Sequence, residues 1–140
     1  MGPANTAIPV VIGSPARGRG PDSRIYVIFT DVEGTRAALT AAAGLAQGLG
    51  LPLELLAARV VPYPLPLNEP PVSVEFMEGA MSRLVGDLDA EVSVNILLCR
   101  DPDQTLRQAL GPDALVVIGG GKPKLARLLQ SDGRRLIVIH

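Results

Sequence analysis

Residues 24–39 read RIYVIFTDVEGTRAAL, and this stretch decides the fold. Its first part, 25–29, is a continuous run of apolar residues, which is typical of a strand buried on both faces. After Asp31 the composition changes to alanine-rich, and apolar residues recur on one helical face as far as Leu49. Gly50 is placed to end that helix. A buried strand that turns directly into a helix predicts a βα unit with a parallel sheet.

The rest of the chain repeats this alternation of strand and helix. Further strands are expected at 53–61, 91–98, 114–118 and 135–139, and helices at 34–49, 72–85, 102–110 and 123–130. Asp101 is a candidate N-cap, followed by Pro102 in the first turn. Five strands alternating with four helices predict an α/β fold, an open five-stranded parallel sheet with helices on both faces.

Two segments interrupt the pattern. Residues 1–23 are rich in Gly and Pro, and we expect a flexible N-terminal segment, with an extra edge strand at 8–12 as the alternative. Residues 62–71, PYPLPLNEPP, predict a stiff, irregular loop. The α/β domain is therefore expected to span 24–140.

The composition excludes several classes of function. The chain has 140 residues, a formal net charge of −1 and 3% aromatic residues, so it lacks the basic surface and the stacking residues of a nucleic-acid binder. Nothing in it approaches a membrane span, and a single cysteine, Cys99, suits a reducing compartment. We expect a cytoplasmic protein with no nucleic-acid or membrane partner.

A ligand site is expected where the strand order reverses, beyond the carboxyl ends of the strands. The first strand is followed by the loop that contains Asp31, and the fourth by Gly119, Gly120, Gly121 and Lys122. Three glycines allow close approach of the backbone to a ligand, and their N–H groups can bind phosphate. The alternative is a plain flexible turn. Both loops form one crevice only if the first and fourth strands are neighbours.

The stretch IFTDVEGT resembles the first motif of the haloacid dehalogenase superfamily. That resemblance implies a phosphatase in which Asp31 is the nucleophile, Glu33 the acid/base and Mg²⁺ the cofactor. The further carboxylates that hold the metal in that family have no counterpart after the fourth strand here. A degenerate phosphatase of this type is the alternative function.

The whole of 24–140 is similar to the universal stress protein (UspA-like) family. The similarity rests on DVEGTRAALTAAAGLAQGLGLPLELL, on the proline loop, and on DALVVIGGG with LIVIH. It implies a Rossmann-like sheet of the adenine nucleotide alpha hydrolase type, with strand order 3-2-1-4-5 in chain numbering. It also implies a binding or regulatory module of the stress response rather than an enzyme.

In members of that family that bind ATP, the first-strand aspartate, a strand-two valine and a Gly-x2-Gly-x9-Gly-Ser/Thr loop contact the nucleotide. Lys122 replaces the second glycine of the loop and Arg134 the Ser/Thr, and the last strand begins soon after Gly133. This shortened, degenerate loop argues against an ordinary ATP site and leaves ATP or AMP as possible ligands. The candidate cofactor-binding residues are Asp31, Val32, Val60, Gly119, Gly120, Gly121 and Lys122.

The resemblance also implies a homodimer formed through the last strand, 135–139. An apolar edge strand of this kind tends to pair with another chain. The third strand is expected to be the opposite edge, where Arg100 is placed to lower the pKa of Cys99. Because such an edge is distant from the crevice, we expect Cys99 to be a structural thiol, with a thiol of lowered pKa as the alternative.

Overall fold

A computed structural model describes residues 8–12, 24–62, 65, 73–86, 88, 91–110 and 114–139. These residues form a single six-stranded sheet in the order β1-β4-β3-β2-β5-β6. Strands β2 to β6 are parallel and β1 is antiparallel to its neighbour β4. The five parallel strands, counted in chain order, have the predicted order 3-2-1-4-5.

The bounds of the elements agree closely with the sequence pattern. The strands are β1 (Ile8–Ile12), β2 (Ile25–Ile28), β3 (Leu53–Val60), β4 (Val92–Cys99), β5 (Leu115–Gly119) and β6 (Arg135–Ile139). The helices are α1 (Val32–Leu49), α2 (Val74–Gly86), α3 (Pro102–Ala109) and α4 (Pro123–Ser131).

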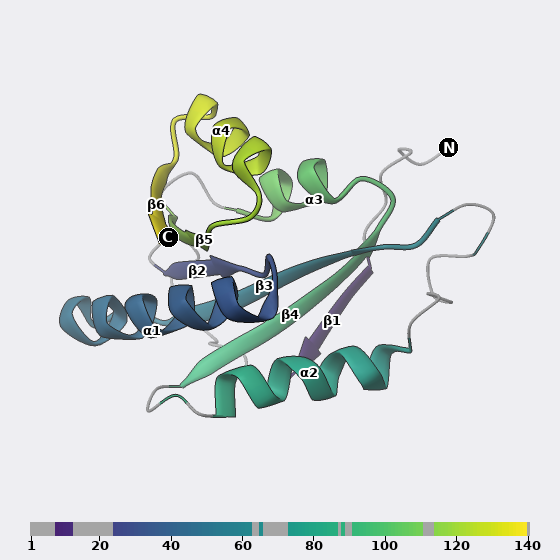
Figure 1. Ribbon diagram of the computed structural model, residues 1–140, viewed down its shortest axis with the longest axis horizontal. Helices are drawn as coiled ribbons and strands as arrows, with labels where there is room; N and C mark the ends of the chain where they lie inside the picture. The colour runs from purple at the N-terminus through teal and green to yellow at the C-terminus, as the bar shows by residue number, and fades with distance from the viewer. Residues whose placement is uncertain are drawn as a thin grey trace.

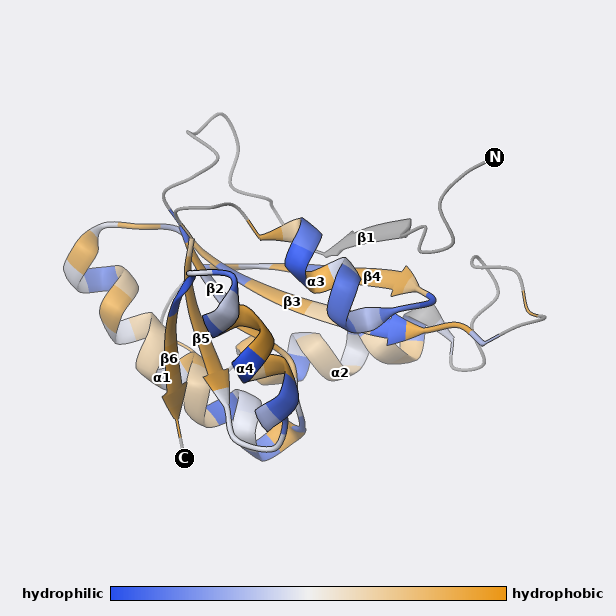
Figure 2. Ribbon diagram, turned by 90° about the horizontal axis from the view of Figure 1, so that it is seen from above, coloured by the Kyte–Doolittle hydropathy of each residue, from blue (hydrophilic) through white to orange (hydrophobic). Residues whose placement is uncertain are grey.

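The sheet lies between two pairs of helices, α1 with α2 on one face and α3 with α4 on the other (Figure 1). Alternate residues of the central strands therefore belong to two separate hydrophobic cores. All four residues of β2 are buried, as expected of a strand covered on both faces. Figure 2 shows the result: β2 to β6 are almost continuously apolar, whereas α3 and α4 each carry a hydrophilic side. None of the helices among the described residues is both long and apolar enough to cross a membrane.

Short side chains cap the starts of two helices, and of these two N-caps only Asp101 was predicted from the sequence. Asp31 is the N-cap of α1, and its Oδ1 accepts from the Gly34 N–H at 2.6 Å. Asp101 caps α3 in the same way, accepting from the Gln104 N–H at 3.2 Å. Each cap satisfies an N–H that has no partner within its helix. The first cap fixes where the chain leaves β2.

The N-terminal part of the chain differs from the expectation. We expected a flexible segment over 1–23, but residues 8–12 form strand β1 and pair with residues 94–98 of β4. An edge position tolerates Pro9, which has no N–H to donate to a sheet. The other residues of 1–23 lie outside the described part of the chain, as does most of the proline loop.

The same pairing corrects a second expectation. The third predicted strand, β4, is not an edge, because β1 covers it. An uncovered β4 would expose the backbone groups of a largely buried apolar strand, and such an edge promotes aggregation. Within the described part of the chain, β6 is the other edge of the sheet, and no described strand covers it.

Candidate functional site

The two loops singled out in the sequence lie next to each other. β2 and β5 are paired in parallel, with Ile25 opposite Leu115 and Ile28 opposite Ile118. The turn that contains Asp31 and the turn at Gly119–Lys122 therefore leave the same edge of the sheet from adjacent strands. This is the point where the strand order reverses, which is the usual ligand position in open α/β sheets.

Gly119 lets the two turns approach each other. A Cβ atom on Gly119 would lie 2.6 Å from the carbonyl carbon of Gly34 and 2.8 Å from its Cα, closer still to its carbonyl oxygen. Any other residue at this position would force the first turn of α1 away from the end of β5. The contact between Gly34 and Gly119 is thus a close backbone junction between both halves of the crevice.

Asp31 sits at the mouth of this junction with an exposed side chain. One of its oxygens caps α1, and the other faces Gly121: a Cβ on Gly121 would lie 3.2 Å from Oδ2. Gly121 has a φ of 107°, a conformation that side-chain-bearing residues rarely adopt. Asp31 therefore has a structural role. Its Oδ1 caps the start of α1, and its Oδ2 is directed at the glycine turn.

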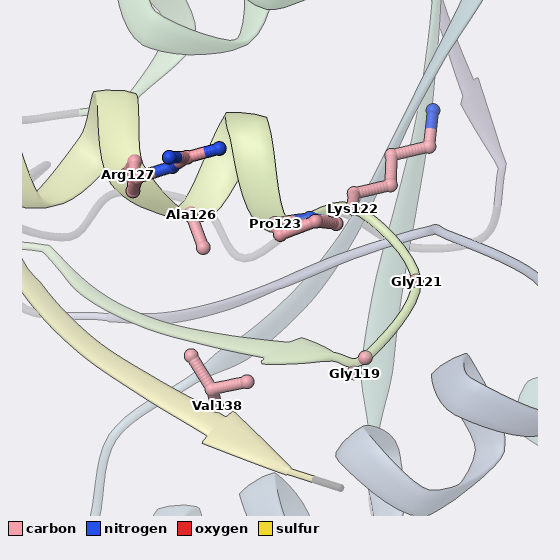
Figure 3. A pocket seen from close by; sticks show the side chains of 8 residues that line it. Gly119, Gly121, Lys122, Pro123, Ala126, Arg127 and Val138 are labelled. Atoms are coloured by element: carbon pink, nitrogen blue, oxygen red, sulfur yellow. The ribbon is translucent and has the colours of Figure 1, made fainter.

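A cavity of about 400 Å³ opens beside the glycine turn, between α4 and β6. Its lining comes from Gly119, Gly120, Gly121, Lys122, Pro123, Ala126, Arg127 and Val138. Figure 3 shows Ala126 and Val138 pointing toward each other across the cavity, and Lys122 extending away from Val138. The cavity combines an apolar floor, a backbone-lined end and two cationic side chains, a set suited to a small anionic ligand with an apolar part.

The structure brings some predicted site residues together and separates others. The four predicted residues of the glycine turn line the cavity, and Asp31 adjoins that turn without lining the cavity itself. Val32 and Val60 are exposed, at 51% and 46%, and neither lines it. Whether any of these residues contacts a nucleotide stays a prediction.

Four lining residues were not singled out as ligand contacts: Pro123, Ala126, Arg127 and Val138. In the sequence, Arg127 is one of several basic residues between 122 and 135 and has no feature that distinguishes it from the others. Its position follows from the packing of α4 against β6, which no local pattern reveals.

The metal chemistry of the phosphatase alternative has no visible support among the described residues. No group of three or more His, Cys, Asp or Glu side chains there is arranged to hold a metal ion. Glu33, the acid/base of that alternative, is exposed in the first turn of α1, where its charge is stabilised by the helix dipole.

The environment of Cys99 agrees with the expected structural thiol and contradicts the alternative, in which Arg100 lowers its pKa. Cys99 is completely buried, and burial is the main reason why its pKa is raised from the ordinary value. Arg100 donates a hydrogen bond to the carbonyl of Val61. Cys99 is therefore a structural thiol with little thiolate at neutral pH.

Comparison with models of known protein families gave no match, and neither did comparison with curated protein sequences. Among solved structures, the chain is similar to a universal stress protein from Archaeoglobus fulgidus in complex with dAMP. The two share 18% sequence identity at a TM-score of 0.60, over 84% of this chain and 98% of the other. The chain therefore has the fold of a universal stress protein.

Proposed function

We propose that this chain is a binding module of the universal stress protein type, and that its crevice takes an adenosine monophosphate rather than ATP. The observation that carries this proposal is the contact between the Asp31 turn and the glycine turn at the point of strand reversal. The structural neighbour was solved with dAMP, a nucleotide with a single phosphate.

The size and charge of the cavity support a ligand with one phosphate. A volume of about 400 Å³ lies at the small end of the range for small-molecule sites, roughly 300–1,000 Å³. One end of the cavity is formed by the start of α4, whose partial positive charge favours an anion. Lys122 and Arg127 supply two positive charges there, and the short segment between Gly121 and Gly133 leaves little loop to enclose a triphosphate.

Titration calorimetry with AMP and with ATP on the full chain tests the proposal. We expect millimolar or tighter binding of AMP, weaker binding of ATP, and loss of most of the affinity in Lys122→Met. Asp31→Ala and Asp101→Ala form a matched pair, because both remove an N-cap but only the first lies at the crevice. A flat titration with both nucleotides removes the proposal, and so does equal weakening of AMP binding in both cap variants.

Phosphatase activity is the competing function. Hydrolysis of para-nitrophenyl phosphate with Mg²⁺, measured on the wild type and Asp31→Asn, separates the two. Asparagine is as good an N-cap as aspartate, so the variant loses the nucleophile and keeps the fold. We expect no turnover above background in either protein. Turnover that disappears in Asp31→Asn would favour the phosphatase.

We also propose that the module is a homodimer that pairs through β6. Its support is the position of β6 at the open edge of the sheet, with four apolar residues, Leu136 to Ile139, that are only partly buried. Pairing with a symmetry-related copy would cover these backbone and side-chain groups in a two-fold interface. Light scattering at micromolar concentration should report twice the monomer mass of 14.6 kDa.

A further inference from the structure

Arg59 occupies an unusual position at the carboxyl end of β3. Its guanidinium carbon lies 4.8 Å from the centroid of the Phe29 ring, which immediately follows β2. Phe29 packs against the core formed with α1 and α2, and Arg59 is in register with Leu98 of that same core. The stacked pair therefore lies on the α1–α2 face of the sheet, near the edge where ligands bind.

An arginine at the opposite end of the same strands provides a comparison. Arg24 lies next to Tyr26, 6.0 Å from the ring centroid, and its guanidinium pairs with Glu54 at 2.6 Å. The side chains of this ion pair are only 13% and 12% exposed. At the amino ends of β2 and β3, a desolvated arginine beside an aromatic ring thus has a carboxylate partner.

Arg59 has no such partner among the described residues. No hydrogen bond or ion pair joins its guanidinium to them, and its Nε is buried without an acceptor. Burial lowers its pKa, and no neighbouring carboxylate offsets that effect. Arg59 is half-buried, and a cation whose Nε–H is buried without an acceptor is stabilised when an anion pairs with it.

We propose that Arg59, held flat by Phe29, is a second anion site of this protein, for a phosphate or carboxylate group. The planar guanidinium binds two oxygens of such a group side by side, and the aromatic ring fixes the plane in which it does so. This site is separate from the cavity beside the glycine turn, because Val138 of that cavity belongs to the core on the other face of the sheet.

An NMR titration of the full chain with inorganic phosphate, and in parallel with acetate, tests this site. Sodium chloride at matched ionic strength is the reference for non-specific charge effects. We expect the Arg59 Nε–H resonance and the backbone amides on either side of Phe29 and Arg59 to shift and saturate with phosphate. Acetate causing the larger saturable shift would assign the site to a carboxylate group, and saturation by either anion supports the proposal.

Two variants separate this site from the proposed nucleotide crevice. Arg59→Met keeps the apolar stem, so we expect it to fold and to lose affinity for phosphate about tenfold or more, the effect of losing charge-assisted hydrogen bonds. Arg127→Met removes a cation from the cavity on the other face and should leave the Arg59 shift unchanged. Conversely, Arg59→Met should bind AMP as the wild type does, so failure of one proposal leaves the other standing.

Thermal unfolding gives an independent readout. A ligand that binds only the folded state raises the unfolding temperature, so phosphate should stabilise the wild type more than Arg59→Met, in which only the cavity beside the glycine turn remains to bind it. Arg127→Met keeps the Arg59 site and should retain the part of the thermal shift that Arg59→Met loses. The proposal is overturned if phosphate and acetate leave the Arg59 resonance where sodium chloride does. It is equally overturned if Arg59→Met gains the same thermal shift from phosphate as the wild type.

Discussion

At the residue scale, the junction between Gly119 and Gly34 makes the sharpest prediction. A methyl group at Gly119 would overlap the backbone of Gly34, so Gly119→Ala should destabilise the fold by about 1–3 kcal/mol. Gly48→Ala is the matched control, because a Cβ there meets no atom within 4 Å and the residue lies inside α1. The control should gain up to about 1 kcal/mol from reduced chain entropy.

Urea unfolding monitored by circular dichroism measures both changes. If Gly119→Ala unfolds at the same urea concentration as the wild type, the two turns are not in backbone contact and the crevice described above does not exist in solution. A loss of stability in Gly48→Ala as well would assign the effect to glycine replacement in general.

How far individual site residues could be predicted depends on whether their neighbours are local in the sequence. Asp31 and the glycine turn stand at strand ends, so the alternation of strands and helices places them without further information. Arg127 and Val138 meet only through packing of α4 on β6, and Phe29 and Arg59 through pairing of β2 with β3. Val32 and Val60 do not line the cavity.

At the element scale, one ion pair joins the ends of the two helices on the same face. Arg107 in the last turn of α3 holds Asp132, the C-cap of α4, by two hydrogen bonds, Nε to Oδ2 at 2.8 Å and a guanidinium N–H to Oδ1 at 2.7 Å. Arg134 donates to the Arg107 carbonyl at 2.9 Å. These contacts hold the C-terminal end of α4 on α3. Residues in the first half of α4 form one wall of the cavity.

This pair makes stability depend on pH in a defined direction. The hydrogen bond from Arg107 is the first cause that lowers the pKa of Asp132 below its ordinary value of 3.8. A lowered pKa contributes stability that is present above the unfolded-state value and is lost as the pH falls through the folded-state value. We therefore expect Asp132→Asn to unfold at lower urea concentration than the wild type at pH 7, by a small amount because the pair lies at the surface, where solvent screens it.

The difference between Asp132→Asn and the wild type should disappear as the pH falls well below 3.8, where the wild-type carboxyl is protonated too. Arg107→Met and the double variant complete a thermodynamic cycle. If the two single changes add without coupling at pH 7, the pair does not stabilise the packing of α4 on α3. High salt should reduce the coupling, since exposed charges are screened.

Strand β1 is the element that sequence reasoning assigned to the wrong class. A run of five apolar residues containing Pro9, flanked by Gly and Pro, is typical of a tail as well as of an edge strand. The deciding factor is the open edge of β4, which lies far along the chain and becomes visible only in the assembled sheet. Local composition alone therefore cannot separate the two.

Replacing residues 8–12 by a Gly-Ser sequence of equal length tests this assignment. Loss of pairing over five positions of β4 should cost on the order of 1–3 kcal/mol, the net of a few backbone hydrogen bonds and the entropy of ordering the strand. The exposed β4 edge should also make the variant self-associate at high concentration, detected by light scattering. Unchanged stability and mass would mean that residues 8–12 are a tail after all.

At the scale of the whole molecule, the predicted strand order came from the resemblance to the universal stress protein family, and the structure confirms it. General rules of topology are consistent with that order. Right-handed crossovers, helices on both faces and one reversal of direction leave a small number of arrangements for five parallel strands. The interior strands β2 and β5 are apolar and almost completely buried, which is what a strand with a neighbour on each side and helices on both faces requires. The assembly of two copies has no such local signature, so it rests on the exposed edge alone.

The proposed dimer through β6 depends on backbone groups that point away from β5. The Ile139 carbonyl accepts from the Gly120 N–H at 2.9 Å, so Ile139 directs its backbone groups toward β5. In a parallel strand successive residues direct these groups to opposite sides, so the N–H of Leu136 faces the open edge. Leu136→Pro should therefore abolish the dimer while the pairing of β6 with β5 survives.

Leu136→Ala is the matched control, since it shortens the same side chain and keeps the N–H. Light scattering should give a monomer for Leu136→Pro and a dimer for the alanine variant. A dimer in both would place the contact elsewhere, and a monomer in both would assign it to the Leu136 side chain instead of the strand edge.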